Sequence, residues 1–378
     1  MDLIIFNLVS GLSFSLAGSI LPELSSVYSL SSSQASLVPY YHFIGNFAGL
    51  IILGILIRKA RAITIASTVL LFGSSLYLAL IPGFTLLFKL SFLVLGASST
   101  VLVALPGMIL SRADPGQAAK NLSFLFAFFC IGVILSPAFT SALIRFGFSY
   151  RGAFLILSLA AGAALTTSIV FRRPLPDLGE GLSPAVVGGA FKTHGLFLVI
   201  IIVIAFLYGA AESIPNVWIP KYLQDRGGSA GMDVRIILSL FWTAMTVGRY
   251  ICSWLVARFV KPLILLLSLS LLGGAVLFFT PRLVHPGYSA LGFILTGLFL
   301  SGMYPLIIAW VDYLPAKYTS MFMIVWAGSM AGGSVMSRVA GRVIESVSFN
   351  MGISIGAVPL ALIALLLFYA KNQSRFKT

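Results

Sequence analysis

Long apolar runs alternate with short polar segments along the whole chain. Each run has about 20 or more residues, the length that an α-helix needs to cross the hydrocarbon core of a bilayer. Most segments between the runs are short and collect glycine, proline and basic residues. The pattern predicts an all-α membrane protein with twelve transmembrane helices. The expected spans are 3–27, 34–57, 62–81, 84–110, 118–144, 152–171, 195–223, 232–258, 262–280, 287–311, 317–343 and 350–370.

Composition supports this interpretation and narrows the function classes. Hydrophobic residues make up 59% of the chain and charged residues 9%, whereas soluble domains carry about 25% charged residues. A net charge of +14 would suggest nucleic acid as the partner of a soluble protein. Here the basic residues cluster in short loops, where they orient a membrane protein. The expected partner is therefore the lipid bilayer and not nucleic acid.

The sequence offers no catalytic constellation. It has no GxxxxGK[ST] loop for a nucleotide, no HExxH motif and no Ser-His-Asp candidate outside the membrane. Cys130 and Cys252 lie alone inside apolar runs and are expected to be packing residues. Asp2 follows Met1 with no basic region, so the first run is expected to be a helix and not a signal peptide. We predict no enzyme activity, no cofactor and no metal site.

The distribution of lysine and arginine predicts the orientation. If the N-terminus lies in the cytoplasm, fourteen basic residues lie at inner ends of spans and eight at outer ends. Cytoplasmic loops carry the excess of basic residues in membrane proteins. We therefore expect both termini in the cytoplasm, in the plasma (inner) membrane.

The chain divides into two similar halves. The longest loop, 172–194, is rich in glycine and proline and separates an N-terminal bundle, 1–171, from a C-terminal bundle, 195–378. Several residues recur between the halves at an offset of about 199, which predicts an internal repeat. Parallel six-helix halves place a binding site at their interface near the bilayer midplane. The matching pairs are Pro22 with Pro220, Gly49 with Gly248, Pro106 with Pro305, and Gly132 with Gly332.

Three short motifs carry a resemblance to a known superfamily. They are GILIRKARA at 54–62, VGRYICSWLVARF at 247–259 and GVILSP at 132–137. Together with twelve spans and a 6+6 repeat, they resemble the major facilitator superfamily. The resemblance implies two pseudo-symmetric six-helix bundles that alternate access to a central site.

Three further pieces are similar to the fucose–proton symporter family of sugar permeases. They read LYGAAESIPNVWIPKYL at 207–223, SLFWTAMTVGR at 239–249 and GLFLSGMYPLIIAW at 297–310. The resemblance implies monosaccharide uptake, often driven by protons. The acids of that family in the first and fourth spans fall on Gly18 and Val101 here, so the N-terminal half offers no carboxylate at midplane depth.

The seventh span contains the most conspicuous polar stripe. Tyr208, Glu212 and Asn216 recur every four residues and so share one helix face. A carboxylate inside an apolar span is costly and usually faces a water-filled cavity. The stripe suits a hydroxylated solute, although Glu212 in a purely structural contact is the alternative. Trp218 is expected either to stack on a sugar or to anchor at the outer interface.

Two other spans repeat this arrangement. His42 and Asn46 share a face of the second span beside Tyr41, with a buried structural histidine as the alternative for His42. Trp242 shares a face of the eighth span with Arg249. We predict Arg249 to be a gating residue or helix tie. The resemblance places Phe128, Tyr304 and Trp326 on cavity-lining spans, with packing as the alternative for each.

The predicted function is secondary transport of a small hydroxylated solute, most simply a sugar, by a monomer. Glu212 and His42 are the candidate proton-coupling residues, since an unperturbed histidine titrates near physiological pH. A facilitator with weak pH dependence stays open as an alternative. So do export of amphipathic compounds or lipids and uptake of an organic anion.

Overall fold

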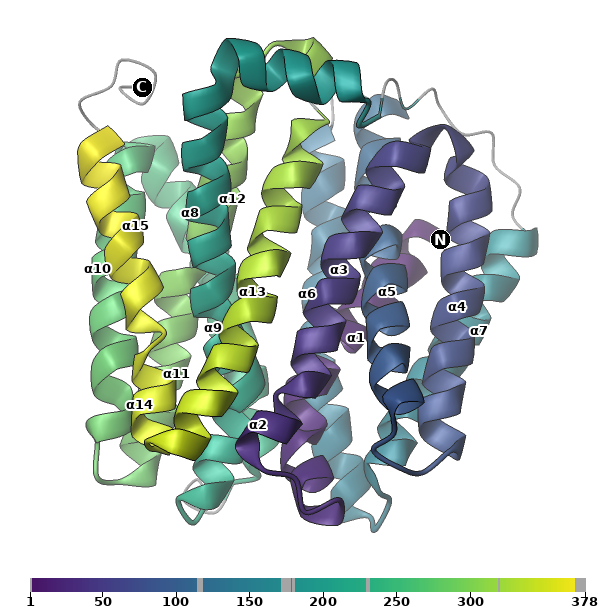
Figure 1. Ribbon diagram of the computed structural model, residues 1–378, viewed down its shortest axis with the longest axis vertical. Helices are drawn as coiled ribbons and strands as arrows, with labels where there is room; N and C mark the ends of the chain where they lie inside the picture. Colours follow the sequence, from purple (N-terminus) through teal and green to yellow (C-terminus); the bar gives the residue numbers. More distant parts are fainter. Residues whose placement is uncertain are drawn as a thin grey trace.

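The computed structural model describes residues 2–113, 118–170, 178, 181–228, 232–318 and 320–370. The described chain is almost entirely α-helical, so the predicted all-α class is confirmed (Figure 1). The N-terminal half contains α1 (Asp2–Val27), α2 (Ser32–Ala35), α3 (Leu37–Leu56), α4 (Ala60–Leu80), α5 (Leu86–Ala113), α6 (Ala118–Arg145) and α7 (Tyr150–Val170). The C-terminal half contains α8 (Pro184–Asp225), α9 (Val234–Arg258), α10 (Pro262–Phe279), α11 (Pro286–Leu300), α12 (Met303–Ala309), α13 (Met321–Ser346), α14 (Phe349–Ser354) and α15 (Ala357–Ala370).

The helices are long enough to span a membrane. Within the described residues, 10 helical stretches have the necessary length and apolarity. One of them, Ser32–Leu80, contains both α3 and α4, which are joined by the 3₁₀ turn Ile57–Lys59. Helix α13 has 26 residues but is less apolar, because its last turns carry Arg338, Arg342 and Glu345. Counting α3 and α4 separately gives eleven apolar spans among the described residues, and α13 matches the remaining expected span in length but not in apolarity.

Helix α8 extends into the segment expected to link the halves. It begins at Pro184, after Ser183 accepts a hydrogen bond from the backbone N–H of Val186, and proline at N1 favours such a start. His194 has non-helical backbone angles and marks a kink. In Figure 1 the first part of α8 runs across the top of the molecule before the helix turns down into the bundle. The spanning part thus begins near the predicted residue 195.

The two halves pair their helices in the same way. In the first half α1 packs on α6, α3 on α5, and α4 on α7. In the second half α8 packs on α13, α9 on α11, and α10 on α15. These are the same three pairings in repeat order, so helix packing reproduces the repeat seen in the sequence.

Glycine permits the closest of these pairings. A Cβ atom on Gly132 of α6 would lie less than 3.0 Å from the carbonyl oxygen of Leu8 in α1. The matching Gly332 of α13 meets the carbonyl oxygen of Phe206 in α8 in the same way. Small residues let backbones approach in membrane bundles, where packing replaces the hydrophobic driving force. The repeated glycines therefore fix equivalent helix contacts in both halves.

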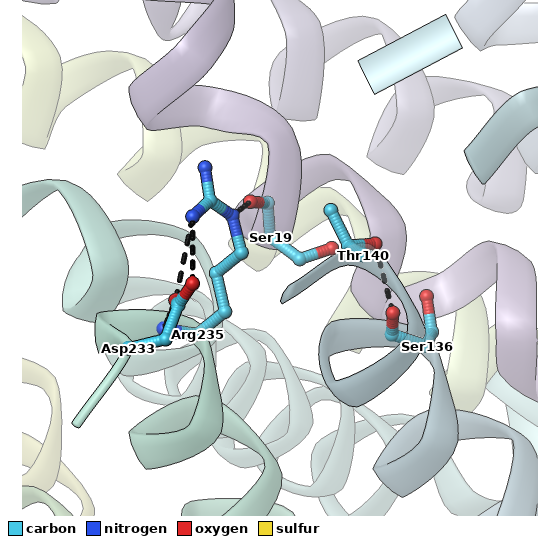
Figure 2. A network of polar contacts seen from close by, with 5 residues as sticks. All are labelled: Ser19, Ser136, Thr140, Asp233 and Arg235. Carbon is cyan, nitrogen blue, oxygen red and sulfur yellow. Dashed lines mark hydrogen bonds and ion pairs between the residues drawn. The ribbon is translucent and has the colours of Figure 1, made fainter. Parts of the chain in front are cut away.

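The two bundles meet along α1 with α8, α3 with α13, and α6 with α9. Near the end where α1 finishes and α9 begins, Arg235 Nε of α9 donates to the Ser19 carbonyl of α1 at 3.0 Å (Figure 2). Close by, Ser239 Oγ donates to the Ile134 carbonyl of α6 at 2.8 Å. These bonds tie the bundles together at one end, which lies at the bottom of Figure 1 with α2.

Candidate functional site

A charged pair lies where α8 meets α9. Glu212 of α8 is buried and interacts electrostatically with Arg249 of α9. Arg249 also donates from Nη1 to Cys130 Sγ of α6 at 3.4 Å, across the bundle interface. Because an isolated charge in a membrane helix is costly, an acid and a cation in reach of each other stabilise one another. The two side chains are not in direct ion-pair contact, so they attract each other over a longer distance.

Aromatic side chains surround the charged pair. Tyr208 and Tyr304 have ring centroids 5.7 Å apart, and Tyr304 and Trp326 have centroids 6.3 Å apart. Tyr208 and Tyr304 also interact electrostatically with both Glu212 and Arg249. The fold thus gathers five of the predicted residues from α8, α9, α12 and α13.

A second cluster centres on Phe14 of α1, which the sequence analysis did not single out. Its ring lies 6.4 Å from His42 of α3 and 5.8 Å from both Phe129 of α6 and Trp242 of α9. Phe14 therefore joins His42 and Trp242 across the bundle interface. A phenylalanine near the middle of the first span was the available signal, but one apolar ring in an apolar run does not stand out.

Several buried polar atoms in this region lack a hydrogen-bond partner among the described residues. More than about 90% of buried polar groups in proteins are hydrogen-bonded. The exceptions on the helices of the two clusters are therefore free to bond a polar partner other than the described residues. The Tyr208 hydroxyl lies near Glu212 without reaching hydrogen-bond geometry. The other atoms are both ring nitrogens of His42, Asn46 Nδ2, Asn216 Oδ1, Trp242 Nε1, Arg249 Nε and Ser329 Oγ.

Three predicted residues lie apart from these clusters. Trp218 is fully buried against Phe349 of α14, inside the C-terminal bundle. Phe128 packs on Phe124 of its own helix, and Tyr41 packs on its neighbour Tyr40. These are packing contacts of the rings, and packing was the alternative considered for Phe128. Trp218 was expected to stack on a sugar or to anchor at the outer interface, and its Nε1 also has no hydrogen-bond partner among the described residues.

Gly18 has a structural reason to differ from the acid expected there. A Cβ atom at this position would lie less than 3.0 Å from the carbonyl oxygen of Asn216 in α8. Any side chain would force α1 and α8 apart. The close contact of the two bundles thus excludes a carboxylate at residue 18 in this conformation.

The described residues contain no group of three or more His, Cys, Asp and Glu side chains that would hold a metal ion. The arrangement instead offers one acid, one guanidinium, aromatic rings and neutral hydrogen-bonding groups. These are groups that form hydrogen bonds and aromatic contacts.

Comparison with known proteins identifies the class. The sequence profile of the Major Facilitator Superfamily matches residues 3–337, and the chain belongs to this superfamily. It is therefore an integral membrane protein of a transporter family. A glucose/galactose transporter from Brucella abortus biovar 1 (strain 9-941) is 24% identical over 380 residues, covering 94% of this chain and 89% of the relative.

Solved structures share the fold along the whole chain. The E. coli fucose:proton symporter FucP matches with a TM-score of 0.67 at 17% identity, over 97% of each chain. A D-xylose-proton symporter matches with a TM-score of 0.78 at 15% identity, over 97% of this chain and 96% of the other. Transporters of other solutes share the fold to a similar degree, so these likenesses show the fold alone.

Proposed function

We propose that this protein is a secondary transporter that takes up a neutral hydroxylated solute, most simply a monosaccharide, by alternating access. The observation that carries the proposal is the buried acid Glu212, which interacts electrostatically with the Arg249 guanidinium among aromatic rings and unpartnered donors and acceptors. A balanced acid and cation favour a neutral solute. An organic anion would be better served by two or more cationic groups.

The surrounding groups fit the chemistry of a sugar. Tyr208, Asn216, His42, Asn46 and Trp242 supply hydroxyl, amide, imidazole and indole groups that match sugar hydroxyls. Tyr304 and Trp326 supply aromatic rings that pack on the apolar face of the sugar, as aromatic side chains do in small-molecule sites. The names of the glucose/galactose relative and of the two sugar symporters support the same substrate class.

The coupling residue in this proposal is Glu212. It is the acid beside a cation at the bundle interface, and the N-terminal half has Gly18 and Val101 where the related symporters have acids. Arg249 acts as the gating partner, because its bond to Cys130 must break when the bundles move apart at this depth. The second candidate, His42, lies beside Phe14 with both ring nitrogens unpartnered among the described residues.

In this proposal the two halves of the chain move against each other. Residues 1–171 and 195–378 form the two moving bundles, and 172–194 is the cytoplasmic linker. Both termini lie in the cytoplasm, and the protein works as a monomer in the plasma (inner) membrane. Export of amphipathic compounds is less well supported, since the polar groups gather in the interior beside a charged pair.

The test is uptake of labelled hexoses into proteoliposomes with and without an imposed inward proton gradient. We expect concentrative uptake of at least one hexose that depends on the gradient. Glu212→Gln should abolish accumulation while retaining insertion and folding. Glu23→Gln is the matched control, because Glu23 accepts a hydrogen bond from the backbone N–H of Tyr150 at the rim of the N-terminal bundle. Uptake of organic acids but not of sugars would overturn the proposal.

A further inference from the structure

The amide of Asn46 is held by one hydrogen bond from another helix. Thr100 of α5 donates from Oγ1 to Asn46 Oδ1 of α3 at 2.8 Å, and both side chains are buried. The other end of the amide, Nδ2, has no hydrogen-bond partner among the described residues. An amide carries an acceptor at one end and two donors at the other, so this bond determines which end is left free.

The bond is rigidly placed because α3 and α5 touch backbone to backbone. A Cβ atom on Gly45 or Gly49 of α3 would lie less than 3.0 Å from the carbonyl oxygen of Leu93 or Ala97 in α5. Gly96 of α5 meets the carbonyl oxygen of His42 in the same way. Three glycines thus leave no room for either helix to slide or rotate at this level.

This contact sets the register of the polar groups. Thr100 lies one turn after Gly96 on α5, and Asn46 lies one turn after His42 on α3, so all four face the same seam. His42 in turn packs edge-on to Phe14, which contacts Trp242 of the opposite bundle. The seam therefore leads from Thr100 to the interface where the two bundles meet.

We propose that Thr100 is a positioning residue that fixes the Asn46 amide with its N–H donors toward the solute. The site then recognises an acceptor at this point, namely the oxygen of one sugar hydroxyl. Thr100 acts through Asn46 and does not itself touch the solute. This inference rests on the proposed sugar transport and adds which atom of the solute Asn46 recognises.

The first test compares three proteins for hexose uptake. Thr100→Val keeps the shape of the side chain but removes the hydroxyl, and Thr100→Ser keeps the hydroxyl. We expect Thr100→Val to raise KM about five- to tenfold, since a neutral hydrogen bond is worth about that factor, and Thr100→Ser to stay near wild type. Thr140→Val is the matched control, because the buried Thr140 hydroxyl bonds the Ser136 carbonyl of its own helix.

The second test uses monodeoxy and monofluoro analogues of the best hexose as competitors. At one ring position the deoxy analogue should bind the wild type more weakly than the parent hexose does. Its affinity for Thr100→Val should be no lower than its affinity for the wild type. The fluoro analogue at that position should keep part of its affinity, because fluorine accepts a weak hydrogen bond and donates none.

Each other outcome contradicts the inference. Equal KM values for wild type, Thr100→Val and Thr100→Ser overturn it, and so does a Thr100→Ser protein as impaired as Thr100→Val. A fluoro analogue as weak as the deoxy analogue at every position means that Asn46 presents its carbonyl. If the wild type takes up no hexose at all, both the proposed function and this inference fail. If the wild type takes up hexose but the Thr100 variants behave otherwise than expected, only this inference fails.

Discussion

Arg235 of the C-terminal bundle donates a 3.0 Å hydrogen bond from Nε to the main-chain carbonyl of Ser19 in the N-terminal bundle. The same guanidinium reaches Asp233 at 3.3 Å, so its charge is paired while it spans the interface (Figure 2). Ser19 lies one turn before Pro22 of α1, which has no N–H to donate to the carbonyl of Gly18. The tie therefore joins a side chain of one bundle to the main chain of the other.

The first prediction follows from this tie. Replacing Arg235 with alanine removes the bond and should shift the protein toward a conformation in which this end of the bundles is open. Spin labels at Val27→Cys and Val347→Cys, in a background without Cys130 and Cys252, report the distance between the bundles at this end. We expect a longer mean distance for Arg235→Ala, and an unchanged distance distribution would contradict the prediction.

A second tie connects α13 to the short helix α2. Arg338 Nη1 bonds the Ser33 carbonyl and lies 3.0 Å from the hydroxyls of Ser33 and Ser36, while the Ser33 N–H donates to Glu345 Oε2 at 2.9 Å. We predict that Arg338→Ala lengthens the Val27–Val347 distance and raises the labelling rate of cysteines placed just inside this end. Arg342→Ala is the matched control, because Arg342 is exposed one turn further along the same helix. Equal effects of the two substitutions would contradict the prediction, because loss of a positive charge and not loss of the bonds to Ser33 and Ser36 would then explain the opening.

The third prediction concerns the packing of α8 on α13. A Cβ atom on Gly209 would lie less than 3.0 Å from the Ser329 carbonyl oxygen, whereas a Cβ atom on Gly195 of the same helix would meet nothing within 4 Å. Gly209→Ala should therefore destabilise the protein by about 1–3 kcal/mol, as overpacking does, while Gly195→Ala should be neutral. Thermal unfolding in detergent measures the difference. A Gly209→Ala protein that melts like the wild type would contradict the prediction, because α8 and α13 would then move apart without loss of stability.

The sequence predicted the fold because its signals are repeated and long. Twelve apolar runs mark the spans, and paired glycines such as Gly132 and Gly332 recur because both halves need the same close helix contacts. The site was harder to predict. The four-residue spacing of Tyr208 and Glu212 gave their shared face, but no spacing shows which residue of another helix lies opposite.

Phe14 and Thr100 illustrate the limit. Both are ordinary residues for a membrane helix, and their positions matter only through His42, Trp242 and Asn46 on other helices. The register between α3 and α5 depends on three-dimensional contact at Gly45 and Gly96. Conversely, Trp218 drew attention through its place between two prolines, yet its ring packs on Phe349 within one bundle.

The fourth prediction tests the orientation in the membrane. Ser26 lies at the end of α1 and Lys192 in the first part of α8, and both are exposed. If the termini are cytoplasmic, an impermeant maleimide should label Ser26→Cys from outside intact cells and Lys192→Cys only after the membrane is opened. Labelling of both residues from the same side would refute the assignment of bundles and linker.

The last prediction concerns the charged pair at the centre of the site. Arg249→Met leaves Glu212 without its cation, and an uncompensated buried charge costs on the order of several kcal/mol. We expect Arg249→Met to be less stable than the wild type and inactive in uptake. The double variant Glu212→Gln, Arg249→Met has no unpaired charge, so it should regain most of the lost stability without regaining gradient-driven uptake. Thermal unfolding and proteoliposome uptake of the wild type, both single variants and the double variant complete the cycle. Additive stability effects would show that the two side chains do not depend on each other, and gradient-driven uptake by the double variant would exclude Glu212 as the proton carrier.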